Sequence, residues 1–209
     1  MPIDPTSEPP APRQARSIET RRRLLEAAIE CLIERGFAST TTAHVCQQAG
    51  VSQGALFKHF PTKAVLWVAC VERLFADLMV DFKNAFQAIA GEADRVGAAV
   101  RLLDRSFREP RLHAAFELFL VSRHDSALRE ALEPVVIAFR ESLRDEARAL
   151  FPVAARENEE FDAFFDVMLS AMQGRALSAL VAPDSRADVR ELVTLYRLVS
   201  REVAGGRGA

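Results

Sequence analysis

Apolar residues recur along most of the chain with a helical spacing, and short breaks rich in glycine, proline and aspartate interrupt them. Within residues 18–35 the apolar positions lie three and four residues apart, as on the buried face of a helix. Gly36 follows and readily takes the positive φ that ends a helix, with Phe37 as the apolar residue that packs back on it. The apolar positions are Leu25, Ala28, Ile29, Leu32 and Ile33.

Capping residues divide the next stretch into two short helices. Serine and threonine side chains accept hydrogen bonds from the free N–H groups at a helix start. Thr40 or Thr41 is placed to cap a helix that runs to about residue 49, and Ser52 to cap one that ends near residue 60. Gly50 and Val51 are suited to the tight turn between them.

The rest of the chain also shows a helical pattern, and no segment alternates long enough to predict a strand. Thr62 is placed to cap the first of these helices. Pro134 lies inside another, which is therefore either kinked or divided in two. We predict an all-α fold. The expected helices cover residues 62–90, 94–108, 110–124, 126–151, 157–182 and 185–204.

Composition agrees with one folded chain of moderate size. Of the 209 residues, 49% are apolar and 27% are charged, which excludes a wholly disordered protein. No run approaches the 18 apolar residues of a membrane span, and the N-terminus lacks the pattern of a signal peptide. Cys31, Cys46 and Cys70 form no C-x-x-C pair. We therefore expect a reduced, cytoplasmic protein without a membrane partner.

The net charge of −2 hides a segregation of charge along the chain. Residues 1–12, which hold five prolines, carry −2, residues 13–63 carry +4, and residues 64–209 carry −4. A basic segment in an acidic chain favours a nucleic-acid-binding module. Chance segregation on solvated helix faces is the alternative interpretation.

The segment 41–63, TTAHVCQQAGVSQGALFKHFPTK, has the layout of a helix-turn-helix. Its apolar positions lock two short helices together around Gly50, and in this motif the second helix enters the DNA major groove. The locking positions are Val45, Ala49, Val51, Leu56 and Phe60.

The other residues of the second helix are expected to face outward, and they suit base and phosphate contacts. Gln53 is able to read an adenine edge, and Gly54 allows close approach to the DNA. Lys63 stands in the first turn of the following helix, where the helix dipole disfavours a cation. A phosphate held between Lys63 and that helix N-terminus would resolve the conflict.

This segment resembles the DNA-binding domain of the TetR family of bacterial transcriptional regulators. The resemblance rests on a capping threonine, A-G-V-S, a glycine-containing opening, an L-x-x-H-F run and a final lysine, and it covers residues 18–66. A Met172-Gln173-Gly174 segment is similar to the penultimate helix of the family. The matching positions are Thr41, Val45, Ala49 to Ser52, Gly54, Leu56 to Phe60 and Pro61 to Lys63.

The resemblance implies a set of DNA-binding residues in the motif. Where the family usually has tyrosine this chain has Phe57, which loses a phosphate contact that Lys58 is placed to replace. For His44, a DNA contact and a bland surface position remain open. Two interpretations remain open for Arg13, Arg16 and the run 21–23: contact with the DNA, or a solvated helix face. The implied residues are Thr41, Thr42, Ala43, His44, Ser52, Gln53, Gly54, Ala55, Phe57, Lys58, His59 and Lys63.

The resemblance also implies an organisation and a function. Residues 1–17 are expected to be a disordered tail, 18–66 the DNA-binding domain, 67–204 a helical ligand-binding and dimerisation domain, and 205–209 a flexible tail. The implied protein is a homodimeric repressor that a small-molecule ligand releases from a palindromic operator. The alternative is a helical ligand carrier or enzyme that binds no DNA, but we find no catalytic motif and expect no cofactor.

Eleven of the fourteen phenylalanines lie beyond residue 61, where a packed core explains most of them. The resemblance adds a ligand pocket and a dimer seam. For Arg123, which ends an apolar stripe, both an anion contact and a favourable place at a helix C-terminus remain open. The pocket candidates are Phe116, Phe119, Arg123, Phe139, Met168 and Met172, and the dimer candidates are Gly174, Leu177, Leu192 and Leu195.

A metal site is not expected at the histidines of residues 110–124. His113 and His124 lie about 16 Å apart along a helix, so they cannot share an ion with Glu117. The pair of His113 and Glu117 is expected to be a surface pair.

Overall fold

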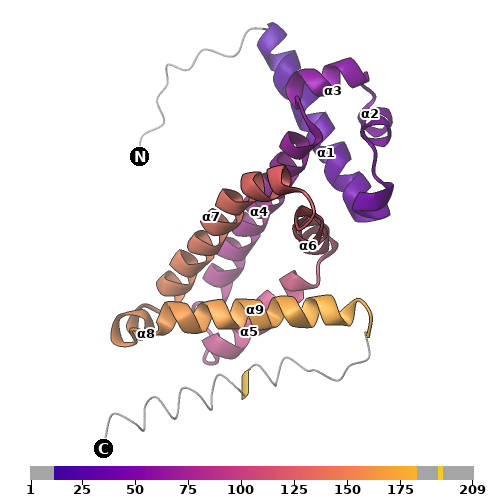
Figure 1. The fold of residues 1–209 in the computed structure, drawn as a ribbon. Coiled ribbons are helices and arrows are strands. Elements are labelled where there is room, and N and C mark those ends of the chain that lie inside the picture. The colour runs from indigo at the N-terminus through magenta and orange to yellow at the C-terminus, as the bar shows by residue number, and fades with distance from the viewer. Residues whose placement is uncertain (1–11, 183–192, 195–209) are drawn as a thin grey trace, which may run out of the picture.

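The computed structural model describes residues 12–182 and 193–194, and within these residues the chain is all α-helical, with no strand (Figure 1). The predicted fold class is confirmed. The helices are α1 (Pro12–Ser39), α2 (Thr42–Ala49), α3 (Gln53–His59), α4 (Lys63–Ile89), α5 (Arg95–Phe107), α6 (Pro110–Ser122), α7 (Ser126–Leu150), α8 (Pro152–Glu157) and α9 (Phe161–Ala179).

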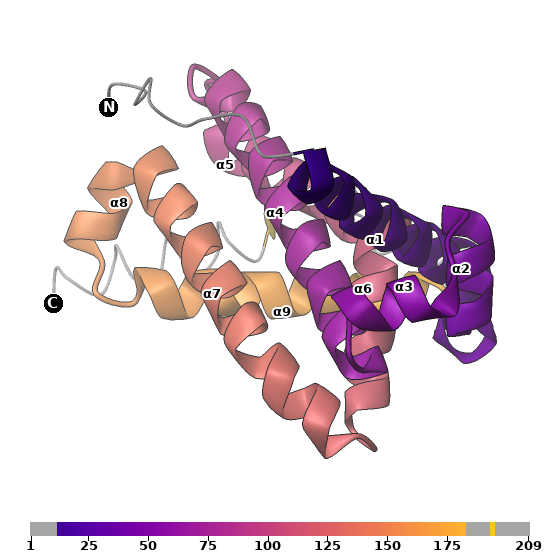
Figure 2. The same ribbon diagram turned by 90° about the horizontal axis from the view of Figure 1, so that it is seen from above.

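Helices α1 to α3 gather at one end of the molecule, and the remaining helices form a larger bundle (Figures 1 and 2). Helix α4 leaves the small unit and runs into the bundle, where it packs most extensively against α7. Helix α6 lies against α1, and α9 crosses the bundle against α5 and α7. The small unit is therefore joined to the bundle through both α4 and α6.

Helix α4 supplies the core with apolar side chains at three- and four-residue spacing, which is the pattern of a helix buried along one face. The Phe37 and Trp67 rings meet edge to face at 5.7 Å and tie the end of α1 to α4. One cluster of buried side chains runs from α1 through α4 to α9. The predicted domain boundary between residues 66 and 67 therefore falls inside a continuous helix. The buried positions of α4 are Leu66, Trp67, Ala69, Cys70, Val71, Leu74, Phe75, Leu78, Phe82 and Phe86.

The predicted caps and stops are largely confirmed. Thr41, Ser52 and Thr62 each accept a hydrogen bond at 3.2 Å from a backbone N–H in the first turn of α2, α3 and α4. Gly36 takes a φ of 73° and breaks the helical path inside α1, which continues past this kink to Ser39. Pro134 lies inside α7, which is one helix and is not divided.

Two expectations were wrong. The predicted tail of residues 1–17 is too long, because α1 begins at Pro12, a residue that loses no hydrogen bond at the first helical position. Residues 152–157 form the short helix α8, again opened by a proline, where a break alone was expected. The predicted helix 185–204, apart from helical residues 193–194, and the tail 205–209 lie outside the described residues.

A largely buried ion pair joins α5 to α9. Arg175 Nε lies 3.5 Å from Asp104 Oδ1, and the two side chains are only 13% and 15% exposed. Arg108, the residue directly after α5, donates from Nε to the other carboxylate oxygen of Asp104 at 3.0 Å. None of the helices in the described part of the chain is both long and apolar enough to cross a membrane.

Candidate nucleic-acid interface

The turn between α2 and α3 is built on Gly50. Its φ of 63° and ψ of 41° place it in the left-handed region, and its N–H bonds to carbonyl groups in the last turn of α2. Val51 N then bonds to Cys46 O at 3.0 Å. Left-handed backbone costs other L-residues about 1–2 kcal/mol, so glycine is the natural residue at this corner.

The residues predicted to lock the two helices are confirmed as interior. Val45, Leu56 and Phe60 are fully buried, Ala49 is buried and Val51 is half-buried. Burial of these side chains uses one face of α2 and one face of α3. The opposite faces are left for solvent or for a ligand.

Helix α1 braces the motif through its arginines. Arg23 donates from Nη2 to Ala49 O at the end of α2. The Arg21 guanidinium lies over the Phe60 ring, 5.1 Å from its centroid, in a cation–π contact. Gln48 Nε2 donates to Glu30 Oε2 at 2.8 Å. These contacts hold α2 and α3 against α1.

Arg22 is held on its own helix by two carboxylates. Its Nη2 lies 2.5 Å from Glu19 Oε1, and its Nη1 lies 2.6 Å from Glu26 Oε1. The hydrogen bond from Arg22 is the main reason that the pKa of Glu19 is lowered. The run 21–23 was expected to reach DNA or to form a solvated face. The structure gives each of its members a partner within the protein.

The candidate DNA-contact residues lie together on the outer side of the motif. Gln53, Gly54 and Lys58 are exposed on α3, and Phe57 is exposed over 42% of its surface. Ala55 and His59 are half-buried. Around α2, the exposed and half-buried candidates are Thr41, Thr42, Ala43 and His44, while Ser52 is exposed at the start of α3.

A hollow of about 570 Å³ separates the first turns of α1 from α3. Its polar lining combines Lys58 and His59 of α3 with Arg16 of α1. Sequence reasoning named these three residues separately but missed that α1 completes this face with Gln14, Ser17 and Thr20. Polar residues recur every three positions in this part of α1. This spacing indicates part of the same surface only when the position of α3 beside it is known.

Helix starts give the interface a positive character. No acidic residue stands in the first turn of α2, α3 or α4, so their free N–H groups carry uncompensated partial positive charge. Lys63 is the first residue of α4 and is exposed, as predicted. A cation beside a helix N-terminus is favourable when an anion lies against both.

Gly50→Ala is expected to lower the free energy of unfolding by about 1–2 kcal/mol, because the left-handed backbone disfavours a Cβ. That Cβ would also lie 3.0 Å from Arg23 Nη2. Gly54→Ala is the matched control, since its Cβ would meet nothing closer than Ser52 Oγ at 3.9 Å. Urea unfolding of both variants measures the difference, and equal stability of the two would contradict this account of the turn.

The pocket candidates of the bundle are in part brought together. Phe119 contacts Phe116 at 6.0 Å and Phe75 at 6.2 Å, and Phe75 stacks on Phe139 at 3.9 Å. Met168 and Met172 are buried on α9. Arg123 is exposed at the C-terminal end of α6, next to the free carbonyl groups of that helix.

The dimer candidates are only partly described. Gly174 is exposed on α9, and a Cβ there would meet nothing within 4 Å. Leu177 is half-buried on the same helix, while Leu192 and Leu195 lie outside the described residues.

The three cysteines are interior. Cys31, Cys46 and Cys70 are free thiols with at most 5% exposure, and burial raises the pKa of each. A raised pKa leaves little thiolate, the reactive form, at neutral pH. The described residues include no group of three or more metal-ligating side chains that could hold an ion.

Comparisons with known proteins agree with this geometry. A family profile described as "Bacterial regulatory proteins, tetR family" matches residues 24–70, the stretch from α1 into α4. The uncharacterized HTH-type transcriptional regulator Rv2912c of Mycobacterium tuberculosis is 28% identical over 90% of this chain and 96% of its own length. The HTH-type transcriptional regulator CymR of Pseudomonas putida is 25% identical over 81% of this chain and 83% of its own.

Solved structures show the same architecture beyond the motif. The multidrug binding protein EbrR, complexed with imidazole, superposes with a TM-score of 0.62 at 26% identity, over 83% of this chain and 92% of that one. This superposition extends well beyond the helix-turn-helix and includes much of the bundle. Residues 24–70 therefore match the DNA-binding unit of the TetR family of bacterial transcriptional regulators, and the relatives of the longer chain support a TetR-family transcriptional regulator.

Proposed function

We propose that this protein is a homodimeric repressor that binds a palindromic operator through α3 and leaves it when a small organic ligand binds. The observation that carries the DNA-binding role is the exposed surface of α3, which presents Gln53, Phe57 and Lys58 while Leu56 is buried in the core. The alternative, a helical carrier or enzyme, gains no support from Rv2912c and CymR, whose curated names are those of transcriptional regulators.

In this proposal Gln53 and Ala55 contact bases in the major groove, and Lys58, His59 and Lys63 contact phosphates. Arg16, across the hollow from α3, extends the phosphate contacts along the backbone. In a dimer, two recognition helices about 34–36 Å apart would match successive major grooves of one operator.

Gln53→Ala and Lys63→Ala test the DNA-binding role. On a palindrome selected by the wild-type protein from random duplexes, Gln53→Ala is expected to weaken binding about tenfold or more and to relax the preference for one base. Lys63→Ala is expected to weaken binding to all sequences and to reduce the salt slope by about one. Fluorescence anisotropy over a salt series measures both effects.

Lys83→Ala is the matched control, because it removes the same charge from α4 twenty residues, or about 30 Å, further along. Lys83 is exposed and lies 3.2 Å from Glu146. Its loss should leave operator affinity unchanged. If Gln53→Ala and Lys63→Ala bind as the wild type does while both remain folded, α3 is not the recognition helix.

The ligand site that we propose is the hollow of about 480 Å³ between α4 and α7. Phe75, Met79 and Phe139 line it, with Glu72 among its polar residues. An aromatic and methionine lining beside a carboxylate suits a planar organic cation. EbrR is described as a multidrug binding protein, and its structures hold imidazole and proflavin, which supports a small organic ligand here.

The dimer seam that we propose lies along the outer face of α9. Val167 is 61% exposed on this face, and Gly174 stands two turns further along with open space above it. Exposed valine beside glycine allows a second helix to approach closely at low cost. Leu192 and Leu195 are proposed to complete this seam.

A further inference from the structure

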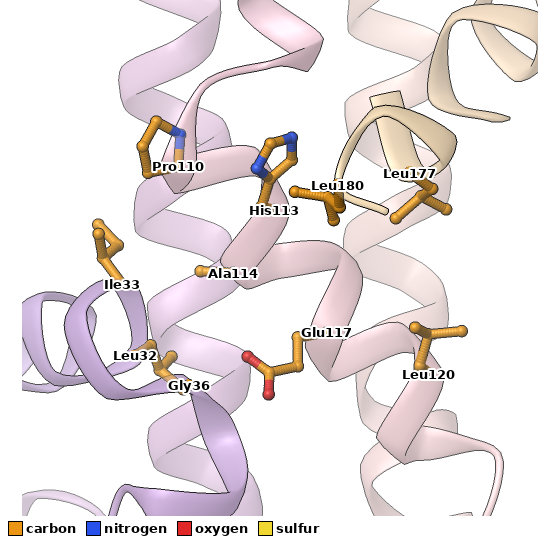
Figure 3. Close-up of a pocket in the computed structure, with 10 residues that line it drawn as sticks. All are labelled: Leu32, Ile33, Gly36, Pro110, His113, Ala114, Glu117, Leu120, Leu177 and Leu180. Atoms are coloured by element: carbon orange, nitrogen blue, oxygen red, sulfur yellow. The ribbon is translucent and has the colours of Figure 1, made fainter. Parts of the chain in front are cut away.

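A third hollow lies at the junction between the DNA-binding helices and the bundle (Figure 3). Its volume is about 320 Å³, and residues of α1, α6 and the end of α9 line it. Ile33, Leu120, Leu177 and Leu180 supply apolar walls. This hollow shares no lining residue with the one between α4 and α7, so it is a separate site.

Glu117 connects the two parts of the protein across this hollow. Its Oε1 accepts a hydrogen bond at 2.9 Å from Phe37 N, at the kinked end of α1. A Cβ on Gly36 would lie 3.1 Å from the same oxygen, so the glycine permits this close approach. In Figure 3 the carboxylate points from α6 toward Gly36. One carboxylate of the bundle thus bonds directly to the backbone that carries the helix-turn-helix.

His113 adds a buried polar atom one turn before Glu117. Its Nε2 is shielded from solvent and has no hydrogen-bond partner among the described residues. A buried polar atom without a partner costs free energy comparable to a lost hydrogen bond, and a bound molecule would recover that cost. The sequence favoured a surface pair for His113 and Glu117, but the structure places both, half-buried, in one concave site.

The lining defines the class of ligand. A carboxylate favours a positively charged N–H donor, the aliphatic walls favour a compact apolar body, and the volume suits a small molecule. An anionic ligand would meet the Glu117 charge in a partly desolvated place. The site therefore suits a small organic ammonium ion with a branched or cyclic aliphatic body.

We infer that this junction hollow binds such an ammonium ion, and that its binding draws Glu117 from Phe37 N and lowers the affinity for operator DNA. The second half of this inference rests on the proposed repressor function, and the binding half does not. Coupling between the two sites would be reciprocal, so operator DNA would weaken amine binding by the same factor.

Three probes with one common body test the inference: cyclohexylamine, cyclohexanol and cyclohexanecarboxylate, which are cationic, neutral and anionic at neutral pH. At millimolar concentration the amine is expected to raise the Tm of the full-length protein and to shift amide signals of α1 and α6 in NMR spectra. It is also expected to weaken operator binding about tenfold. The alcohol should bind more weakly, and the carboxylate should not bind.

Glu117→Gln removes the charge but keeps an oxygen that can accept from Phe37 N, so it should fold and lose the amine response. Glu130→Gln is the matched control, because it removes an exposed carboxylate of α7 that lines neither hollow, and it should keep the amine response. The inference is overturned if the amine does not bind, which is the result expected when another part of the chain or a second copy fills the hollow. It is equally overturned if Glu117→Gln binds the amine as tightly as the wild type does. It is also overturned if the amine binds and operator affinity is unchanged. A protein that binds the amine but no DNA refutes the repressor function instead.

Discussion

Phe60→Ala is expected to lower the free energy of unfolding by about 3–5 kcal/mol, the range for truncation of a fully buried phenylalanine. The Phe60 ring is completely buried, and it is packed at the point where α3 ends. Alanine would leave a cavity between α1 and α3 and would remove the ring that supports the Arg21 guanidinium. Urea unfolding monitored by circular dichroism measures the loss.

Phe57→Ala is the matched control for this prediction, because it changes the same residue type three positions earlier, at an exposed position of α3. Phe57 is 42% exposed, and its truncation should change stability by no more than about 0.5 kcal/mol. We expect Phe57→Ala to weaken operator binding through lost sugar and methyl contacts instead. If the two variants lost equal stability, the assignment of inner and outer faces of α3 would be wrong.

Asp104→Ala is expected to cost about 3 kcal/mol, because it leaves the Arg175 guanidinium in a largely buried place without this counter-charge. The two side chains are 15% and 13% exposed, so water replaces little of the lost interaction. Chemical denaturation at neutral pH measures the effect. Arg108→Ala removes the exposed partner of the same carboxylate and should cost no more than about 1 kcal/mol.

A double variant separates the destabilisation caused by removing one charge from the net contribution of the ion pair to the free energy of unfolding. Asp104→Leu combined with Arg175→Met replaces both charges by apolar side chains of similar length. Such replacements of buried pairs are often neutral or stabilising, so the double variant should recover most of the stability lost in Asp104→Ala. A double variant as unstable as Asp104→Ala would show that the pair itself, rather than the charge left on Arg175, holds α5 to α9.

Local features of the DNA-binding unit could be predicted from the sequence because local physics decides them. Thr41, Ser52 and Thr62 cap their helices through bonds to residues three positions away, and Gly50 takes the left-handed turn within four residues of its partners. The apolar spacing of α3 distinguished buried Phe60 from exposed Phe57. These results require no knowledge of distant parts of the chain.

Contacts between distant segments could not be predicted in the same way. Arg23 reaches Ala49 across 26 residues, and Glu117 reaches Phe37 across 80. Spacing along one helix defines a face but not the element that packs against it. The sequence therefore left a DNA contact and a solvated face open for the run 21–23, and it favoured a surface pair for His113 and Glu117. The packing of α1 against α2 and the end of α3 changed the first interpretation, and its packing against α6 changed the second.

Helix α4 is unbroken from Lys63 to Ile89, so it can tilt as one stiff rod. Lys63 at its start and Phe75, which lines the α4–α7 hollow, are twelve residues apart, about 18 Å along a stiff rod. A tilt of about 6° pivoting at Phe75 carries Lys63 through about 2 Å, enough to lengthen a 3 Å hydrogen bond beyond its useful range. A small rotation of α4 in the bundle would thereby become a displacement of ångströms at the start of this helix, where the proposed phosphate contact of Lys63 lies.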